Sequence, residues 1–351
     1  MQKPLTKKKS KKIIIAIIAG NLLLIGAYIF FQVRAGRLYE ADSGHRLVMG
    51  TIARVVVIAD SKKTGNLCIE KAFDAIEKIE GLMSYYKEDS EISRINRDGF
   101  KEAVTVSADT FYLIKRSIQF SELTKGAFDI TVGPLKDLWQ NAADTNAVPT
   151  EQQLEQVRAK VGYEKIILNE SDLSVRFAVE GMKLDLGGIA KGYAVDEAME
   201  IIIRTGCQGA MVDLGGNIRC FGTTAKGEKD RLIGIQNPDV NSPNQNILTL
   251  KLTGQAVATS GNYRRFFQIN GGRHSHILNL TSGESAEELS SVTIITEQAT
   301  DADALSTAVT VMGADKGLEL IGKIPYTEAV LITAAPEYKI IKTSGADEFI
   351  N

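Results

Sequence analysis

The chain has few of the residues that mark disulfide-rich or zinc-binding proteins. Its 351 residues include only three cysteines, Cys68, Cys207 and Cys220, without a CxxC pair, and only three histidines. A disulfide framework and a zinc site are therefore not supported, and we expect the cysteines to be buried as small apolar residues with at most one disulfide. No repeat of fixed period and no low-complexity linker occurs, which favours one continuous folded unit.

Acidic residues are absent from the first 37 positions. The segment 1–12 carries six lysines, and the 19 residues of 13–31, IIIAIIAGNLLLIGAYIFF, are uncharged. At ~1.5 Å per residue, a helix of this length just crosses a bilayer core. Lysines before the span, with only Arg34 and Arg37 soon after it, favour a cytoplasmic N-terminus.

The sequence therefore predicts a single-pass protein of the cell (inner) membrane whose main part is periplasmic or otherwise extracytoplasmic. Its segments are a basic cytoplasmic tail at 1–12, a transmembrane helix at 13–31, a juxtamembrane linker at 32–44 and a folded domain at 45–345. A cleaved signal peptide is the alternative. The apolar run exceeds a typical signal-peptide core, and Arg34 precedes the small-residue candidate near Ala35, so we favour an uncleaved anchor.

The chain beyond residue 37 is acidic. It holds 33 basic and 43 acidic residues, for a net charge of −10. Nucleic acid is therefore not an expected partner.

The pattern of apolar residues predicts an α+β fold, with helices and strands partly segregated along the chain. Helices are expected at 64–83, 108–124, 150–161, 191–205, 300–312 and 315–322. Strands are expected at 51–59, 290–296 and 329–335, and within 164–170, 173–179, 181–188, 209–222, 231–237, 246–254 and 255–261.

A glycine-rich segment, LDLGGIAKGYAVD at 184–196, leads from a strand-like run into a helical one. It contains no G-x-G-x-x-G, and Tyr193 stands where a Walker A loop requires lysine. A tight structural connection with a solvated Lys191 is the plain alternative. The similar VDLGG at 212–216 predicts a second turn of like shape, and both turns are able to approach a ligand closely.

The segment ATDADALSTAVTVMG at 299–313 places Asp303 and Thr307 four residues apart. On a helix they share a face, and Mg²⁺ prefers oxygen ligands of this kind. The alternative is a helix cap, because 300–303 also fits the S/T-x-x-D/E capping pattern.

Histidine and aromatic residues mark two further candidate regions. His274 and His276 alternate with Ser275 in an extended stretch, where a histidine near neutrality acts as acid or base. Tyr85, Tyr86, Phe128 and Trp139 offer flat surfaces that stack on rings, although such residues more often belong to the core.

Taken together, these segments resemble the ApbE family, the FAD:protein FMN transferases, over roughly residues 45–345. The resemblance rests on MGT at 49–51, SYYKEDSEISRIN at 84–96, GAFDITVGPLKDLW at 126–139, LDLGGIAKGYAVD at 184–196, VDLGGNI at 212–218, ATSGNYRR at 258–265, SHILN at 275–279 and ADALSTAVTVMG at 302–313. It implies an ApbE-like fold of mixed sheets with packed helices. It also implies a Mg²⁺-dependent enzyme that cleaves FAD, attaches FMN through its phosphate to a threonine or serine hydroxyl of an extracytoplasmic protein, and releases AMP.

The resemblance also implies which residues form the site. The flavin pocket would use Met49, Tyr86, Ala127, Phe128, Asp129, Asp185, Lys191 and His276. The metal would be held by the backbone carbonyl of Gly188 with the side chains of Asp303 and Thr307. His276 would be the catalytic base for the incoming hydroxyl, and Mg²⁺ with Lys191 would offset the charge of the pyrophosphate.

Two other activities remain open at this point. Some relatives are similar to the transferases yet mainly hydrolyse FAD to FMN and AMP, and a flavin-binding protein without chemistry is a third possibility. An aromatic residue at Tyr86 favours transfer, because it is able to cover the flavin. The acceptor pattern of the family is D-[AG]-x-[ST]-x-[AST]-T; the segment 303–309 nearly matches it but ends in Val309, so self-modification is not expected.

Overall fold

The computed structural model describes most of the chain beyond the N-terminal segment. The described residues are 38–239, 241–242, 245–262 and 266–351, with four isolated positions, Ile17, Gly20, Asn21 and Leu24. The transmembrane helix predicted at 13–31 thus lies outside the described residues except at those four positions. Within the part of the chain that is described, no helix has the length and apolar character needed to span a membrane.

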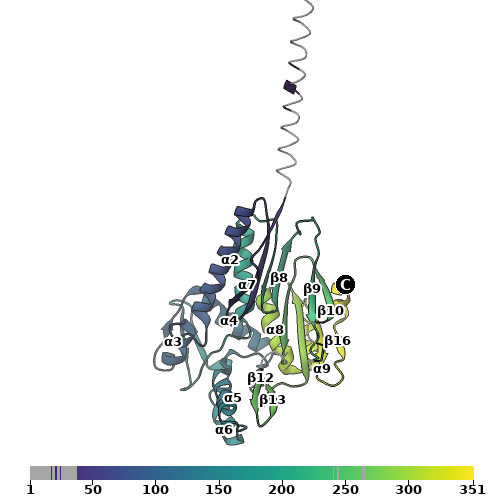
Figure 1. Cartoon of the computed structure of the whole chain (residues 1–351). Helices are drawn as coiled ribbons and strands as arrows, with labels where there is room; N and C mark the ends of the chain where they lie inside the picture. The colour runs from purple at the N-terminus through teal and green to yellow at the C-terminus, as the bar shows by residue number, and fades with distance from the viewer. Residues whose placement is uncertain are drawn as a thin grey trace, which may run out of the picture.

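A nine-stranded sheet forms the centre of the molecule (Figure 1). Its strands lie in the order β1 (Tyr39–Asp42), β3 (Thr51–Ala59), β7 (Gly209–Leu214), β8 (Asn217–Gly222), β11 (Ala256–Gly261), β14 (Leu289–Thr296), β15 (Glu328–Thr333) and β16 (Ile340–Lys342), with β2 (Arg46–Val48) also paired to β3. All strand pairs of the described residues are antiparallel, so the expected sheets of mixed direction are not found. The α+β class is confirmed.

Alternate residues of the sheet strands enter two separate cores. Val292 and Ile294 of β14 face the helices, whereas Ile295 faces the opposite side. There the hairpin of β9 (Arg231–Gln236) and β10 (Asn246–Leu252) covers the sheet. The sheet is therefore covered on both faces, and every residue of β14 is buried, its serines and threonines included.

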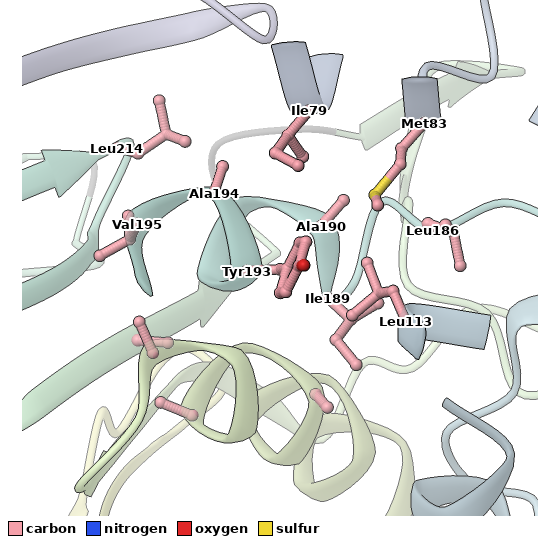
Figure 2. Packing of buried hydrophobic residues seen from close by; sticks show 14 of the residues in the cluster. Ile79, Met83, Leu113, Leu186, Ile189, Ala190, Tyr193, Ala194, Val195 and Leu214 are labelled. Carbon is pink, nitrogen blue, oxygen red and sulfur yellow. The ribbon is translucent and has the colours of Figure 1, made fainter. Parts of the chain in front are cut away.

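Three long helices cover the other face: α2 (Lys62–Met83), α7 (Ala190–Arg204) and α8 (Ala299–Met312). Helix α7 lies in the middle of this core. Figure 2 shows Tyr193 and Ala194 of α7 among Ile79 and Met83 of α2 and Leu113 of α4 (Ala108–Leu123). The Tyr193 hydroxyl donates to Asp109 at 3.0 Å, so this residue fixes α7 in the core and is not directed at a phosphate.

A smaller cluster lies at the end of the sheet where β12 and β13 are drawn (Figure 1). It joins α5 (Gly133–Thr145) and α6 (Glu151–Arg158) to the hairpin of β12 (Phe266–Ile269) and β13 (Gly272–Ser275). Trp139 is its centre: the ring stacks on Phe267 at 6.0 Å, and the indole N–H donates to Gly283 O at 2.9 Å. Trp139 is thus a core residue, which was the alternative to a role in stacking on a ligand ring.

The remaining elements are short. They are α3 (Glu91–Asp98), α9 (Ala314–Ile321), β4 (Val104–Thr105), β5 (Ile166–Asn169), β6 (Ser174–Phe177), and the 3₁₀ turns η1 (Ile130–Val132), η2 (Tyr163–Lys165) and η3 (Ser344–Phe349). Strands β4, β6 and β5 form a separate three-stranded sheet. The cysteines are free thiols buried in the cores, as expected, with the Cys68 and Cys207 sulfurs 2.8 Å apart.

Two expectations about the glycine segments are wrong. Residues 181–188 form no strand, and the two DLGG turns differ in shape. Gly215 and Gly216 have φ of 65° and 93° and close the β7–β8 hairpin, whereas Gly187 and Gly188 have no positive φ and lead into α7. The shared letters therefore do not correspond to one shared backbone conformation.

Candidate active site

A cavity of about 410 Å³ opens where the segment before α7, the first turn of α5, helix α8 and the β12–β13 region meet. Its size falls in the range of small-molecule sites. The structure brings to its wall most of the residues that the sequence singled out, namely Tyr86, Ala127, Phe128, Asp129, Asp185, Gly188, Lys191, His276, Asp303 and Thr307. Met49 is not among the lining residues; it lies partly buried in the turn before Thr51, which does line the cavity.

The segment 184–188 is anchored in the core by its apolar residues. Leu184 and Leu186 are fully buried, and the Asn96 side chain both donates to the Leu184 carbonyl and accepts its N–H, at 2.9 and 2.6 Å. Asp185, which lies between these two leucines, faces the cavity. Asp185 accepts the Gly187 N–H at 2.8 Å, which shapes the turn that presents the two glycines.

Asp303 joins α8 to the beginning of α7. Its buried carboxylate accepts the backbone N–H of Gly192 at 3.0 Å and lies 3.2 Å from the Lys191 ammonium. Lys191 also donates to the Gly187 carbonyl at 3.0 Å. Lys191 is therefore a fixed cation of the cavity wall and not the solvated lysine of the plain alternative.

The interpretation of Asp303 as the cap of its own helix is wrong, because Asp303 binds the first turn of α7 and Asp196 caps α8. Helix α8 begins at Ala299, and the N–H groups of Ala299 and Thr300 are taken by Asp196 of α7, at 3.0 and 2.8 Å. Asp303 in turn binds the first turn of α7. Each helix thus satisfies orphan N–H groups of the other, so the α7 N-terminus is already occupied by a carboxylate and does not present itself to a phosphate.

Gly188 lies against the face of α8 that carries Thr307. A Cβ at Gly188 would meet Thr307 Oγ1 at 3.1 Å and the Phe128 ring at 3.3 Å. The absence of a side chain therefore brings the backbone of this turn close to the Thr307 hydroxyl, one helical turn from Asp303. A peptide oxygen, a hydroxyl and a carboxylate are the donor set of a hard divalent cation.

A second lysine lines the cavity and was not anticipated from the sequence. Lys136, in the first turns of α5, forms an ion pair with Asp185, and its ammonium lies 4.7 Å from the ring centres of both Tyr85 and Tyr86. Although burial disfavours its charge, the Asp185 carboxylate raises the pKa of Lys136 above its ordinary value. The sequence carried no signal for this lysine, because helix α5 itself was not predicted.

Asp129 lines the cavity but its carboxylate serves the fold. It accepts from the backbone and hydroxyl of Thr131, both at 2.8 Å, and from the Tyr163 N–H at 2.9 Å. Burial raises the pKa of Asp129 above its ordinary value despite these donors. The neighbouring Phe128 is buried with an edge-to-face contact to Phe120, so this run forms the firm apolar floor of the cavity.

The two neighbouring histidines have different surroundings. His276 is exposed and lines the cavity, whereas the His274 ring packs on Trp139 at 5.1 Å. Tyr86 is 78% exposed at the rim, and the Tyr85 hydroxyl donates to Asp137 at 2.6 Å. Only His276 of this pair is placed to meet a group entering the cavity.

Comparison with known proteins identifies relatives of this chain. The model of the ApbE family matches residues 49–331. A relative from Vibrio cholerae, an FAD:protein FMN transferase, is 33% identical over 307 residues, which cover 86% of this chain and 91% of the relative. A second FAD:protein FMN transferase, from Haemophilus influenzae, is 34% identical over 285 residues, covering 78% and 82%.

A solved structure shows the same fold. The crystal structure of an ApbE protein from Thermotoga maritima is similar with a TM-score of 0.79 and 33% identity, over 90% of this chain and 99% of that one. This chain, an antiparallel sheet layered with helices beside a cavity lined by Lys136 and Lys191, belongs to the ApbE family.

Proposed function

We propose that this chain transfers FMN from FAD to a threonine or serine hydroxyl of a target protein and releases AMP, with Mg²⁺ as the required metal. Flavin transfer is the activity named for the curated relatives. The observation that carries the proposal for this chain is the meeting of Lys191, Asp303, Thr307 and Gly188 on one wall of the cavity.

The residues present fit a magnesium ion that shares its coordination with a substrate. Among the described residues, no group of three His, Cys, Asp or Glu comes together, and the candidate set has one carboxylate. Mg²⁺ is commonly bound by one or two carboxylates, with waters and substrate phosphates completing its shell. Asp303, Thr307 and the Gly188 carbonyl would hold the ion, which would polarise the pyrophosphate.

The cavity residues have different roles in this reaction. Lys191 supplies a fixed positive charge for a phosphate oxygen, and Phe128 and Tyr86 offer apolar surface to the flavin rings. His276 lines the exposed side, where it would accept the proton of the incoming hydroxyl. The phosphoester to the acceptor oxygen forms as the pyrophosphate bond to AMP breaks.

Membrane anchoring and an extracytoplasmic location are part of the same proposal. They rest on the uncharged run 13–31 with lysines before it. The near-match 303–309 supports an acceptor on another protein, because it lies within α8 with Ser306 and Val309 fully buried. The acceptor would carry the D-[AG]-x-[ST]-x-[AST]-T pattern.

Release of AMP separates the three candidate activities. The domain from residue 38 is incubated with FAD and Mg²⁺, with and without a peptide bearing the acceptor pattern. A transferase releases AMP mainly when the peptide is present, with one modified peptide per AMP. Equal AMP release without peptide identifies a hydrolase. FAD that stays intact identifies a flavin-binding protein.

A further inference from the structure

Lys136 links two parts of the cavity that are distant in sequence. Its ammonium pairs with Asp185, in the turn that presents Gly188, and lies 4.7 Å from the ring centre of Tyr86 at the rim. Tyr86 itself is 78% exposed. Lys136 thus contacts Tyr86, a residue that is largely exposed to solvent.

The neighbouring Tyr85, whose ring centre also lies 4.7 Å from the Lys136 ammonium, has a further anchor. Its hydroxyl donates to Asp137, which also pairs with Lys183 at 2.6 Å. The Tyr85 ring meets Tyr86 edge-on at 5.6 Å and 82°. Tyr86 therefore has two ring-level contacts, the edge of a fixed tyrosine and the Lys136 cation, and the cation joins it to the base of the cavity.

Interactions within helix α5 do not explain why a lysine occupies position 136. It is the fourth residue of α5, where a cation faces the positive end of the helix dipole. Burial of the ammonium group adds a desolvation cost, which the Asp185 carboxylate offsets. Two partners of this charge, Asp185 and Tyr86, line the cavity.

We propose that Lys136 is a positioning residue that holds Tyr86 across the cavity mouth, so that the Tyr86 ring covers bound flavin and limits the access of water. This inference rests on the proposed function. Lys136 acts through Tyr86 and sets how the FMN phosphoryl group is divided between an acceptor hydroxyl and water.

The test is a double-mutant cycle of Lys136→Met and Tyr86→Leu, read as the ratio of FMN on the acceptor peptide to free FMN. Methionine keeps the length of the stem and removes the charge. Lys136→Met should lower the ratio about two- to fivefold, the range of one cation–π contact at an exposed site. In the Tyr86→Leu background the same change should leave the ratio unaltered, because the residue through which Lys136 acts is gone.

A second readout does not depend on turnover. With FAD bound in the presence of a chelator, collisional quenching of flavin fluorescence by acrylamide reports solvent access. Lys136→Met and Tyr86→Leu should raise quenching to a similar level, and Lys136→Arg should restore the wild-type value. Lys115→Met, which breaks the surface pair with Glu170, is the matched control.

The outcomes separate this inference from the proposed function. Absence of transfer by the unmodified protein rejects the proposed function and this inference with it. Normal transfer by the unmodified protein, with Lys136→Met unchanged in both ratio and quenching, rejects the role of Lys136 alone. A shift that persists in the Tyr86→Leu background also rejects it, because the effect then passes through Asp185 or Tyr85.

Discussion

The Asp303 carboxylate of α8 accepts the Gly192 N–H of α7 at 3.0 Å, while Asp196 of α7 accepts the N–H groups that begin α8. The two helices are capped by each other. The close approach needs a glycine, since a Cβ at Gly192 would lie 2.2 Å from the Ala299 carbonyl oxygen. The position of the Asp303 carboxylate is thus set by the fold before any metal binds.

Asp303→Asn should abolish most activity while leaving the fold intact. The asparagine oxygen still accepts the Gly192 N–H, but the metal loses its only carboxylate. We expect the rate of AMP release to fall roughly 100-fold or more, since metal charge stabilisation contributes several kcal/mol. Steady-state rates at increasing Mg²⁺ check this. Asp301→Asn, on the same helix but paired with Arg116, is the control and should keep activity; equal losses in both variants would contradict the metal role.

Asp196→Ala should strongly destabilise the protein. The buried carboxylate accepts from Ala299, from Thr300 and from Arg219, whose guanidinium would be left without its nearest partner. Removing one member of a buried pair costs about 3–5 kcal/mol. Urea unfolding measures the loss. Glu200→Ala removes the more exposed second partner of Arg219, 3.7 Å away, and should cost no more than about 1 kcal/mol; similar losses would disprove the mutual capping.

The free energy of unfolding should depend on pH through Asp129. Burial raises its folded-state pKa above the ordinary 3.8, so the native carboxyl keeps its proton to higher pH than the unfolded one. Its contribution to stability therefore falls as pH rises from about 3.8 through the folded-state pKa. Asp129→Asn has no such charge, so the wild type should lose stability relative to the variant across that window. A difference that is constant with pH in chemical denaturation would contradict this.

His276→Ala should reduce transfer far more than FAD binding. A general base contributes about 10²–10⁴-fold to a rate, whereas one polar side chain at an exposed rim adds little to affinity. Single-turnover transfer and equilibrium titration of FAD measure the two effects. His274→Ala serves as the control, because that ring packs on Trp139 and should affect stability instead. Full transfer by His276→Ala would remove this histidine from the mechanism.

The sequence predicted the strongly periodic elements well and the irregular ones poorly. The long helices and the apolar strands of the sheet lie within a few residues of their expected bounds, since burial of one face enforces their period. Helix α5 was missed because Gly133 and Pro134 at its start look like a turn. The segment 181–188 was misread as a strand because alternating leucines also suit a loop whose backbone is held by Asn96.

The sequence predicted the site residues that belong to a recognisable motif. It did not predict those that reach the site only through the packing of the fold. Lys191, Asp303 and Thr307 lie together on the cavity wall as expected. Lys136 could not be found from spacing, because its partners Asp185 and Tyr86 are 49 and 50 residues away in opposite directions. Nor could the exchange of caps between Asp196 and Asp303 be foreseen, since each carboxylate serves the other helix.

The central claim is most directly tested by the intact mass of an acceptor protein carrying the D-[AG]-x-[ST]-x-[AST]-T pattern, after incubation with this chain, FAD and Mg²⁺. The account predicts a gain of one FMN less one water, which is lost with Asp303→Asn and when the acceptor hydroxyl residue is replaced by valine. An acceptor of unchanged mass, whether FAD is consumed or stays intact, would contradict it.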